Sequence, residues 1–299
     1  MTAVATRRIV LLARASEYER LLQLHGTREQ ARFFLASRGQ SIEGVEARHE
    51  AQEAALHLAS AAIPVDARRA RVERDELDRF LFEPDDIVVA VGQDGLVANA
   101  AKYLEGQPVV GLNPDPDRNP GVLVPHPPEA AMDLIADVAA GRGSIEYRCM
   151  VRGALDDGQS LVALNELFVG HRSHQSARYD IRWGTHAEFQ SSSGLIVATG
   201  TGSTGWARSI HRERGSGLSL PRPCEPILAF FVREAWPSIA TGTSCTEGAI
   251  GPAGSLEIVS RMERGGVCFG DGIEGDALEL PWGAKLTIAL AERRLALVV

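Results

Sequence analysis

The sequence predicts an N-terminal Rossmann-like α/β domain followed by a β-sandwich-like C-terminal domain. In the first third, unbroken apolar runs alternate with segments of helical period, which is typical of a parallel sheet covered on both faces. Residues 113–128 then contain six prolines and cannot form a regular element. Beyond residue 140, short alternating segments separated by Gly, Asp and Ser indicate the closely spaced strands of a sandwich or folded-over sheet.

In the α/β region, unbroken apolar runs predict strands, and apolar residues at three- and four-residue steps predict helices. Strands are predicted at 7–14, 86–91 and 108–112, and helices at 18–37, 45–62, 97–104 and 128–140. The strand–helix–strand order from 86 to 112 is a βαβ unit. Because the proline-rich stretch interrupts the pattern, we expect one domain over residues 1–124 and a β-rich domain over 125–284.

Composition excludes several classes of protein. The chain has 299 residues, a net charge of −8 and a pI near 5.6, which argues against nucleic acid as the main partner. No apolar run approaches the roughly 20 residues that cross a bilayer, so no membrane partner is expected. A strand pattern starts at Arg8, so no targeting peptide is expected in this sequence. The four cysteines form no CxxC pair, which favours reduced, structural thiols and a cytoplasmic location.

The stretch "VGQDGL", residues 91–96, follows a buried strand and precedes a helix. Ligands of open α/β sheets bind at this place, and Gly92 and Gly95 let the backbone approach a phosphate closely. There Asp94 could orient or deprotonate a hydroxyl group beside a bound phosphate. The alternative is a plain turn in which Asp94 caps the helix.

The stretch "ATGTGSTGWARS", residues 198–209, is rich in Gly, Ser and Thr and also follows a strand. Its glycines fit GxGxxG, but the stretch does not open the first βαβ unit, as a dinucleotide fingerprint would. A loop that holds phosphate or ribose through N–H and hydroxyl groups is one interpretation, and a glycine-rich hairpin connection is the other.

Two polar residues, Asn165 and Glu166, interrupt an otherwise apolar run. Such a pair either contacts a ligand or is satisfied internally. His171 and His174 follow, without a third ligand at metal-binding spacing, so no protein-held metal is expected. The sequence contains no Walker A motif, no GxSxG elbow and no protein-kinase motif set.

Together these stretches resemble the NAD kinase family. In order, they are similar to its Gly-Gly-Asp-Gly turn, its Asn-Glu pair and its Thr-Gly-Ser-Thr loop. The segments "YERLLQLHGTREQARFF", "GLNPDPDRNPG", "LNELFVG", "SSGLIVATGTGSTGWARSI" and "PILAFFVREA" look like the mitochondrial-type branch. The resemblance covers nearly the whole chain.

The resemblance implies an enzyme that transfers the ATP γ-phosphate to the adenosine ribose 2′-hydroxyl of NAD, giving NADP. Asp94 would be the general base, and Asn165 and Glu166 would hold the ribose. The other implied nucleotide-binding residues are Gly92, Gln93, Gly95, Thr201, Gly202, Ser203, Thr204, Trp206 and Ser209. The family also implies Mg²⁺ held mainly through the ATP phosphates, a homo-oligomer with the dimer favoured, and a C-terminal segment, 285–299, that returns to the α/β domain.

The sequence departs from the family at three positions. Gln93 replaces a glycine, Leu96 replaces a threonine, and Ser193 replaces an aspartate, the last also in the mitochondrial-type branch. We expect Gln93 to keep φ below zero, with its side chain turned from the nucleotide or donating to a phosphate. Two alternatives stay open: a related kinase with another hydroxyl acceptor, and a nucleotide-binding homologue weakened by Gln93.

Overall fold

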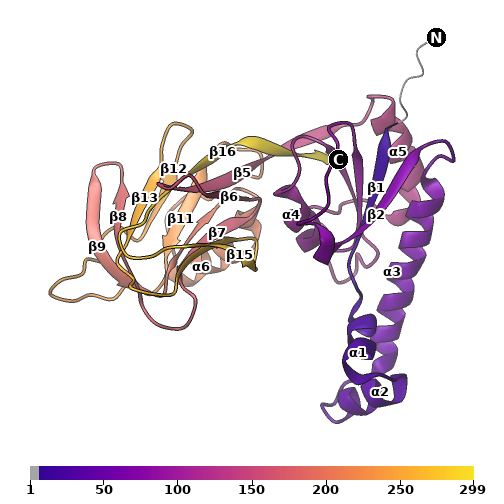
Figure 1. Cartoon of the computed structure of the whole chain (residues 1–299), viewed down its shortest axis with the longest axis horizontal. Helices are drawn as coiled ribbons and strands as arrows, with labels where there is room; N and C mark the ends of the chain where they lie inside the picture. Colours follow the sequence, from indigo (N-terminus) through magenta and orange to yellow (C-terminus); the bar gives the residue numbers. More distant parts are fainter. Residues whose placement is uncertain (1–6) are drawn as a thin grey trace. The chain divides into compact units, whose positions relative to one another are not determined.

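The computed structural model describes residues 7–299, and the chain forms two compact units (Figure 1). The first unit ends at Glu146 and includes Ala296–Val299, and the second spans Tyr147–Leu295. This division lies later than the boundary expected after residue 124. The reason is α5 (Ala131–Ala139), which buries Ala131, Ile135 and Val138 in the core of the first unit.

The first unit contains a parallel sheet in the order β2-β1-β3-β4. Its strands are β1 (Arg8–Ala13), β2 (Arg68–Glu73), β3 (Ile87–Val91) and β4 (Pro108–Leu112). The chain passes from β1 to β2 on one side and then to β3 and β4 on the other, so the strand order reverses between β1 and β3. In such sheets the crevice beyond the carboxyl ends of those two strands is the usual ligand site.

The end of the chain joins this sheet. Strand β16 (Lys285–Val298) places Ala296 and Leu297 parallel to Pro108 and Val109 of β4. Near the same place, the imidazole of His126 hydrogen-bonds the Val298 carbonyl over 3.0 Å. The C-terminal residues are therefore part of the first unit's sheet and core.

The helices differ from the predicted ones mainly at their ends. The single helix expected over 18–37 is two, α1 (Glu17–His25) and α2 (Arg28–Ala36), because Gly26 turns at φ 80° and Thr27 caps α2 by accepting from Gln30 N–H. Both pack beside α3 (Ile42–Ala62) (Figure 1). α4 (Asp94–Ala101) begins before the predicted residue 97. The described residues also contain three short 3₁₀ turns, η1 (Arg74–Glu76), η2 (Pro128–Ala130) and η3 (Gly202–Thr204).

The second unit is built from two antiparallel sheets. One has the order β12 (Glu247–Ile250), β11 (Leu228–Val232), β10 (Leu195–Ala198), β7 (Glu166–His171), β14 (Gly266–Gly270), β15 (Ile273–Glu279). The other contains β9 (His186–Ser192), β8 (Ala177–Trp183), β13 (Leu256–Ser260), β16, β5 (Ile145–Leu155) and β6 (Ser160–Ala163).

The apolar faces of the two sheets share one core, in which Tyr179, Phe230 and Ile258 are fully buried. Helix α6 (Trp206–Arg214) covers the other face of β10 and β11 through Ala207 and Ile210. The predicted fold class, an α/β domain followed by a β-sandwich-like domain, is confirmed. Within residues 7–299, no helix is long and apolar enough to cross a membrane.

Candidate functional site

The turn after β3 is shaped by its first glycine and by Gln93. Gly92 has φ 153°, a conformation that favours glycine, and donates its N–H to the Leu112 carbonyl over 3.0 Å. Gln93 is exposed and extended, with φ −108° and ψ 163°, which confirms the predicted negative φ. At Gly95 an added Cβ would meet nothing within 4 Å, so the space above this residue is open.

Asp94 is the first residue of α4, and its carboxylate is held by the proline-rich segment. Its two oxygens accept N–H bonds from Val122, over 3.1 Å, and from Leu123, over 2.8 Å. This segment can approach because β4 has a glycine there: a Cβ at Gly111 would lie 2.1 Å from the Leu123 carbonyl oxygen. A carboxylate has about four acceptor sites, so two remain for a ligand hydroxyl. The structure favours this oriented carboxylate over a side-chain helix cap.

A cavity of about 110 Å³ opens beside the turn. It lies at the crevice where the strand order reverses, since its lining includes Arg14, just after β1, and Gly92 and Gln93, just after β3. Gln93 therefore faces the place where a ligand of the sheet is expected.

In the second unit, Leu164 and Asn165 form the bend that leads into β7, and Glu166 is the first residue of that strand. A third polar residue, Asp271, holds this bend: its carboxylate accepts N–H bonds from Leu164 (2.8 Å), Asn165 (2.7 Å) and Glu166 (3.3 Å). Asp271 itself lies at φ 52°, in the turn between β14 and β15. The apolar run is thus interrupted because the backbone turns here, and Asp271 satisfies the amides exposed by the turn.

The Thr-Gly-Ser-Thr loop lies directly against this bend. Thr199 connects the two: its hydroxyl donates to the Leu164 carbonyl over 2.6 Å and accepts from the N–H groups of Thr201 and Gly202. Only glycine fits at position 202, because a Cβ there would lie 2.1 Å from the Asn165 carbonyl oxygen. The sequence-predicted residues Asn165, Glu166 and 201–204 are therefore neighbours.

Two groups in this cluster have unusual environments. Burial, and next the negative charge of Asp271, raise the pKa of the Glu166 carboxyl to about 7. The Thr201 hydroxyl is buried and finds no hydrogen-bond partner in the described part of the chain. A carboxyl group that titrates near neutrality beside an unpaired hydroxyl is typical of a ligand site.

Trp206 lies on the surface of the second unit. It is 36% exposed, and its ring stacks on Phe168 at 6.0 Å with an interplanar angle of 13°. The guanidinium of Arg233 lies 5.3 Å from the centre of the Trp206 ring. These residues line a cavity of about 390 Å³ together with Phe269. Trp206 is thus a cavity residue, whereas Ser209, whose hydroxyl lies 3.5 Å from the Gly205 carbonyl, sits on the exposed side of α6.

Sequence reasoning missed Thr199 and Asp271. Asp271 stands between Gly270 and Gly272, the same arrangement of an acid beside glycines that singled out Asp94, so a signal was available. The role of Asp271 was hidden because its amide partners lie 105 to 107 positions earlier in the chain. Over residues 7–299, no three His, Cys, Asp or Glu side chains converge as a metal site would require.

No protein-family model matches the chain, but similar proteins are found among known sequences and solved structures. Over 265 residues the chain is 27% identical to the rat protein "NAD kinase 2, mitochondrial", and over 287 residues it is 28% identical to its human counterpart. A NAD kinase of Bordetella avium is 31% identical over 138 residues. The matches cover 69%, 72% and 43% of this chain, and 60%, 63% and 45% of the relatives' own lengths.

Solved structures show the same fold. A yeast NADH kinase complexed with NADH superposes with a TM-score of 0.58 at 16% identity, covering 98% of this chain and 84% of that one. An Archaeoglobus fulgidus NAD kinase in complex with ATP superposes with a TM-score of 0.59 at 17% identity. The match covers 98% of this chain and 94% of that one. In sequence the chain is similar to NAD kinases, including two named as mitochondrial, and in fold it is similar to solved NAD and NADH kinases.

Proposed function

We propose that the chain is a NAD kinase, which transfers the γ-phosphate of ATP to the 2′-hydroxyl of the adenosine ribose of NAD. The products are NADP, ADP and one proton. The observation that carries the proposal is the Asp94 carboxylate, held by two backbone amides at the crevice where the strand order reverses. The similarity to NAD kinases in sequence and in fold supports the choice of reaction.

In this proposal Asp94 is the general base. It accepts the proton of the 2′-hydroxyl as the ribose oxygen attacks the γ-phosphorus and the bond to the β–γ bridging oxygen breaks. The N–H groups of Val122 and Leu123 fix the direction of the carboxylate, so no reorientation is needed in the transition state. Gly92 and Gly95 leave the backbone of the turn accessible to phosphate, and Gln93 adds a side-chain amide donor.

The polar cluster of the second unit holds NAD. Asn165 and Glu166 would bind the ribose and neighbouring groups. The hydroxyl and N–H groups of Thr201, Gly202, Ser203 and Thr204 would bind the remaining polar atoms, while Trp206 and Ser209 would line the dinucleotide site. The unpartnered hydroxyl of Thr201 and the raised pKa of Glu166 support this assignment.

Mg²⁺ would enter on the ATP phosphates, which is its usual mode in such enzymes, and neutralise part of their charge. The donor set fits this mode, because Asp115 lines the turn cavity as a single carboxylate and, within residues 7–299, no three His, Cys, Asp or Glu side chains form a cage. We further propose a cytoplasmic homodimer.

A second candidate is a kinase with another hydroxyl acceptor, and a third is a nucleotide-binding homologue weakened by Gln93. The exposed, extended Gln93 leaves the turn open and favours the active enzyme.

The test is incubation with ATP, Mg²⁺ and NAD, followed by enzymatic detection of NADP, beside a panel of other hydroxyl acceptors. A matched titration of NAD and ATP binding separates an inactive nucleotide-binding protein from an enzyme. Phosphorylation of another acceptor without NADP would establish the second candidate instead.

A further inference from the structure

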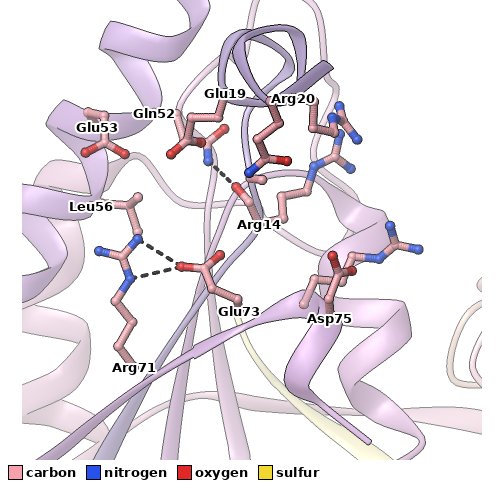
Figure 2. A pocket seen from close by; sticks show the side chains of 12 residues that line it. Arg14, Glu19, Arg20, Gln52, Glu53, Leu56, Arg71, Glu73 and Asp75 are labelled. Carbon is pink, nitrogen blue, oxygen red and sulfur yellow. Dashed lines mark hydrogen bonds and ion pairs between the residues drawn. The ribbon is translucent and has the colours of Figure 1, made fainter. Parts of the chain in front are cut away.

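The chain's four cysteines all belong to the second unit. The first unit instead has a cavity of about 330 Å³ lined mainly by charged and amide side chains, where Arg71 donates two bonds to Glu73 (Figure 2). That cavity shares Arg14, Arg20 and Gln52 with the cavity at the turn after β3, so it belongs to the candidate site. The thiols take no part in the proposed reaction.

Two of the cysteines lie on adjacent backbone segments. Cys149, in β5, is 2% exposed, and its N–H donates to the Pro223 carbonyl over 3.4 Å. Its thiol donates to the carbonyl oxygen of Cys224 over 3.5 Å. Hydrogen-bonded neighbours in an antiparallel pair have Cα atoms about 4.5 to 5.5 Å apart, and a disulfide spans about 4.4 to 6.8 Å. Contacts of this kind bring the two cysteines within reach of a disulfide bond.

The two cysteines differ in their access to solvent. Cys224 is half-buried, in a β-turn where the Glu225 N–H donates to the Arg222 carbonyl and the Glu225 carboxylate accepts the Arg222 N–H, each over 2.9 Å. A reagent in solution therefore meets Cys224 first. Burial raises the pKa of the Cys149 thiol, against the positive charge of Arg294, so Cys149 is the slower nucleophile.

The other two cysteines are buried among apolar side chains. Cys245 and Cys268 belong to the core shared by the two sheets. Burial raises the pKa of the Cys268 thiol to about 12, and burial followed by the negative charge of Glu188 raises the pKa of Cys245. Buried, protonated thiols are inert toward oxidants, so Cys245 and Cys268 serve as internal controls.

The turn that contains Cys224 packs directly on the Thr-Gly-Ser-Thr loop. A Cβ at Gly200 would lie 1.8 Å from the Arg222 carbonyl oxygen and 2.7 Å from the Pro223 nitrogen, so only glycine allows this contact. Gly200 stands between Thr199, which ties the loop to the bend before β7, and Thr201. Because backbone packs on backbone here, a shift of the turn shifts the loop.

We propose that Cys149 and Cys224 form a reversible disulfide that weakens ligand binding by the Thr-Gly-Ser-Thr loop. The oxidant is hydrogen peroxide. The Cys224 thiolate attacks one peroxide oxygen, the O–O bond breaks, hydroxide leaves, and Cys224 becomes a sulfenic acid. The Cys149 sulfur then attacks the Cys224 sulfur, and the Cys149 proton leaves with the displaced hydroxyl as water. The two thiols lose two electrons and two protons, peroxide becomes two water molecules, and a dithiol reductant reverses the change. In a reducing compartment such disulfides are transient and act as sensors.

The test treats the reduced full-length protein with hydrogen peroxide and then counts its thiols under denaturing conditions. We expect the count to fall from four to two, and mass spectrometry of a non-reducing digest to show a peptide that joins Cys149 to Cys224. Dithiothreitol should restore all four thiols. Cys224→Ser, a nearly isosteric change in the turn, should form no such link. Cys245→Ala is the matched control and should form it as wild type does.

The second readout is the affinity for NAD, and it rests on the proposed function. We expect oxidised wild type to bind NAD about fivefold or more weakly than reduced wild type, and Cys224→Ser to bind NAD equally before and after peroxide. Four thiols after peroxide, or a disulfide that involves Cys245 or Cys268, would overturn the proposal. A Cys149–Cys224 link with unchanged NAD affinity would overturn its effect on the loop. If the reduced protein binds no NAD, the proposed function fails, whereas the thiol count and the link still decide whether the disulfide forms.

Discussion

Glu166→Gln should change how the stability of the second unit depends on pH. The folded state raises the pKa of Glu166 from 4.5 to about 7, so between these values the folded protein keeps a proton that the unfolded chain has lost. Stability from this group is therefore fully present below about pH 4.5 and is lost as pH rises through about 7. A pKa rise of this size corresponds to a loss of about 3 kcal/mol.

Glutamine has nearly the same shape as glutamate but no charge, so Glu166→Gln should not lose this stability as the pH rises. Denaturant unfolding between about pH 5 and 8 measures the difference, and tryptophan fluorescence reports the second unit alone, because Trp183, Trp206, Trp236 and Trp282 all lie within it. Relative to wild type, Glu166→Gln should gain stability toward pH 8, up to about 3 kcal/mol. Glu213→Gln, which removes an exposed carboxylate of α6, is the control and should follow the wild-type curve. Parallel curves for Glu166→Gln and wild type would show that folding does not raise the pKa of Glu166.

Three further substitutions test neighbouring parts of the site. In Asp271→Asn, asparagine can adopt the same φ of 52°, but it accepts the three amide hydrogen bonds less strongly than a carboxylate. The free energy of unfolding, followed by tryptophan fluorescence, should fall by about 1 to 3 kcal/mol. Unchanged stability would contradict this role of Asp271. Gln93→Gly should retain NADP formation and shift mainly the ATP KM, by an amount equivalent to about 1 to 3 kcal/mol; a gain of activity over an inert wild type would instead make Gln93 a blocking residue. Trp206→Phe should abolish the change in intrinsic fluorescence that saturating NAD produces in wild type, and the same change in both proteins would place NAD elsewhere.

The sequence predicted the buried strands well, because they depend on local pattern. The unbroken apolar run at Ile87–Val91 is a fully buried strand, and the glycines around Asp94 correctly marked the turn that follows it. The strand Arg68–Glu73 was not predicted, since it forms the sheet edge and only Val72 is buried. Edge strands often carry charged residues and lack the periodic pattern of a half-buried strand.

Other features depended on contacts that no local pattern contains. The domain boundary was expected too early because only tertiary packing shows that Ala131, Ile135 and Val138 belong to the first core. In the same way, the bend at Asn165 depends on Asp271. The break between α1 and α2 is different, because the sequence contains its signal: Gly26 ends one helix and Thr27 caps the next. The prediction missed it because the helical spacing of apolar residues continues past these two positions.

If Asp94 is the base in phosphoryl transfer to NAD, then removing its carboxylate should slow that transfer. The most direct test is the rate of NADP formation from ATP, Mg²⁺ and NAD by wild type and by Asp94→Asn. We expect NADP formation by wild type and a turnover lower by about 10² to 10⁴-fold in the variant, with a nearly unchanged melting temperature. Full activity in Asp94→Asn, or no NADP from wild type that binds both substrates, would contradict it.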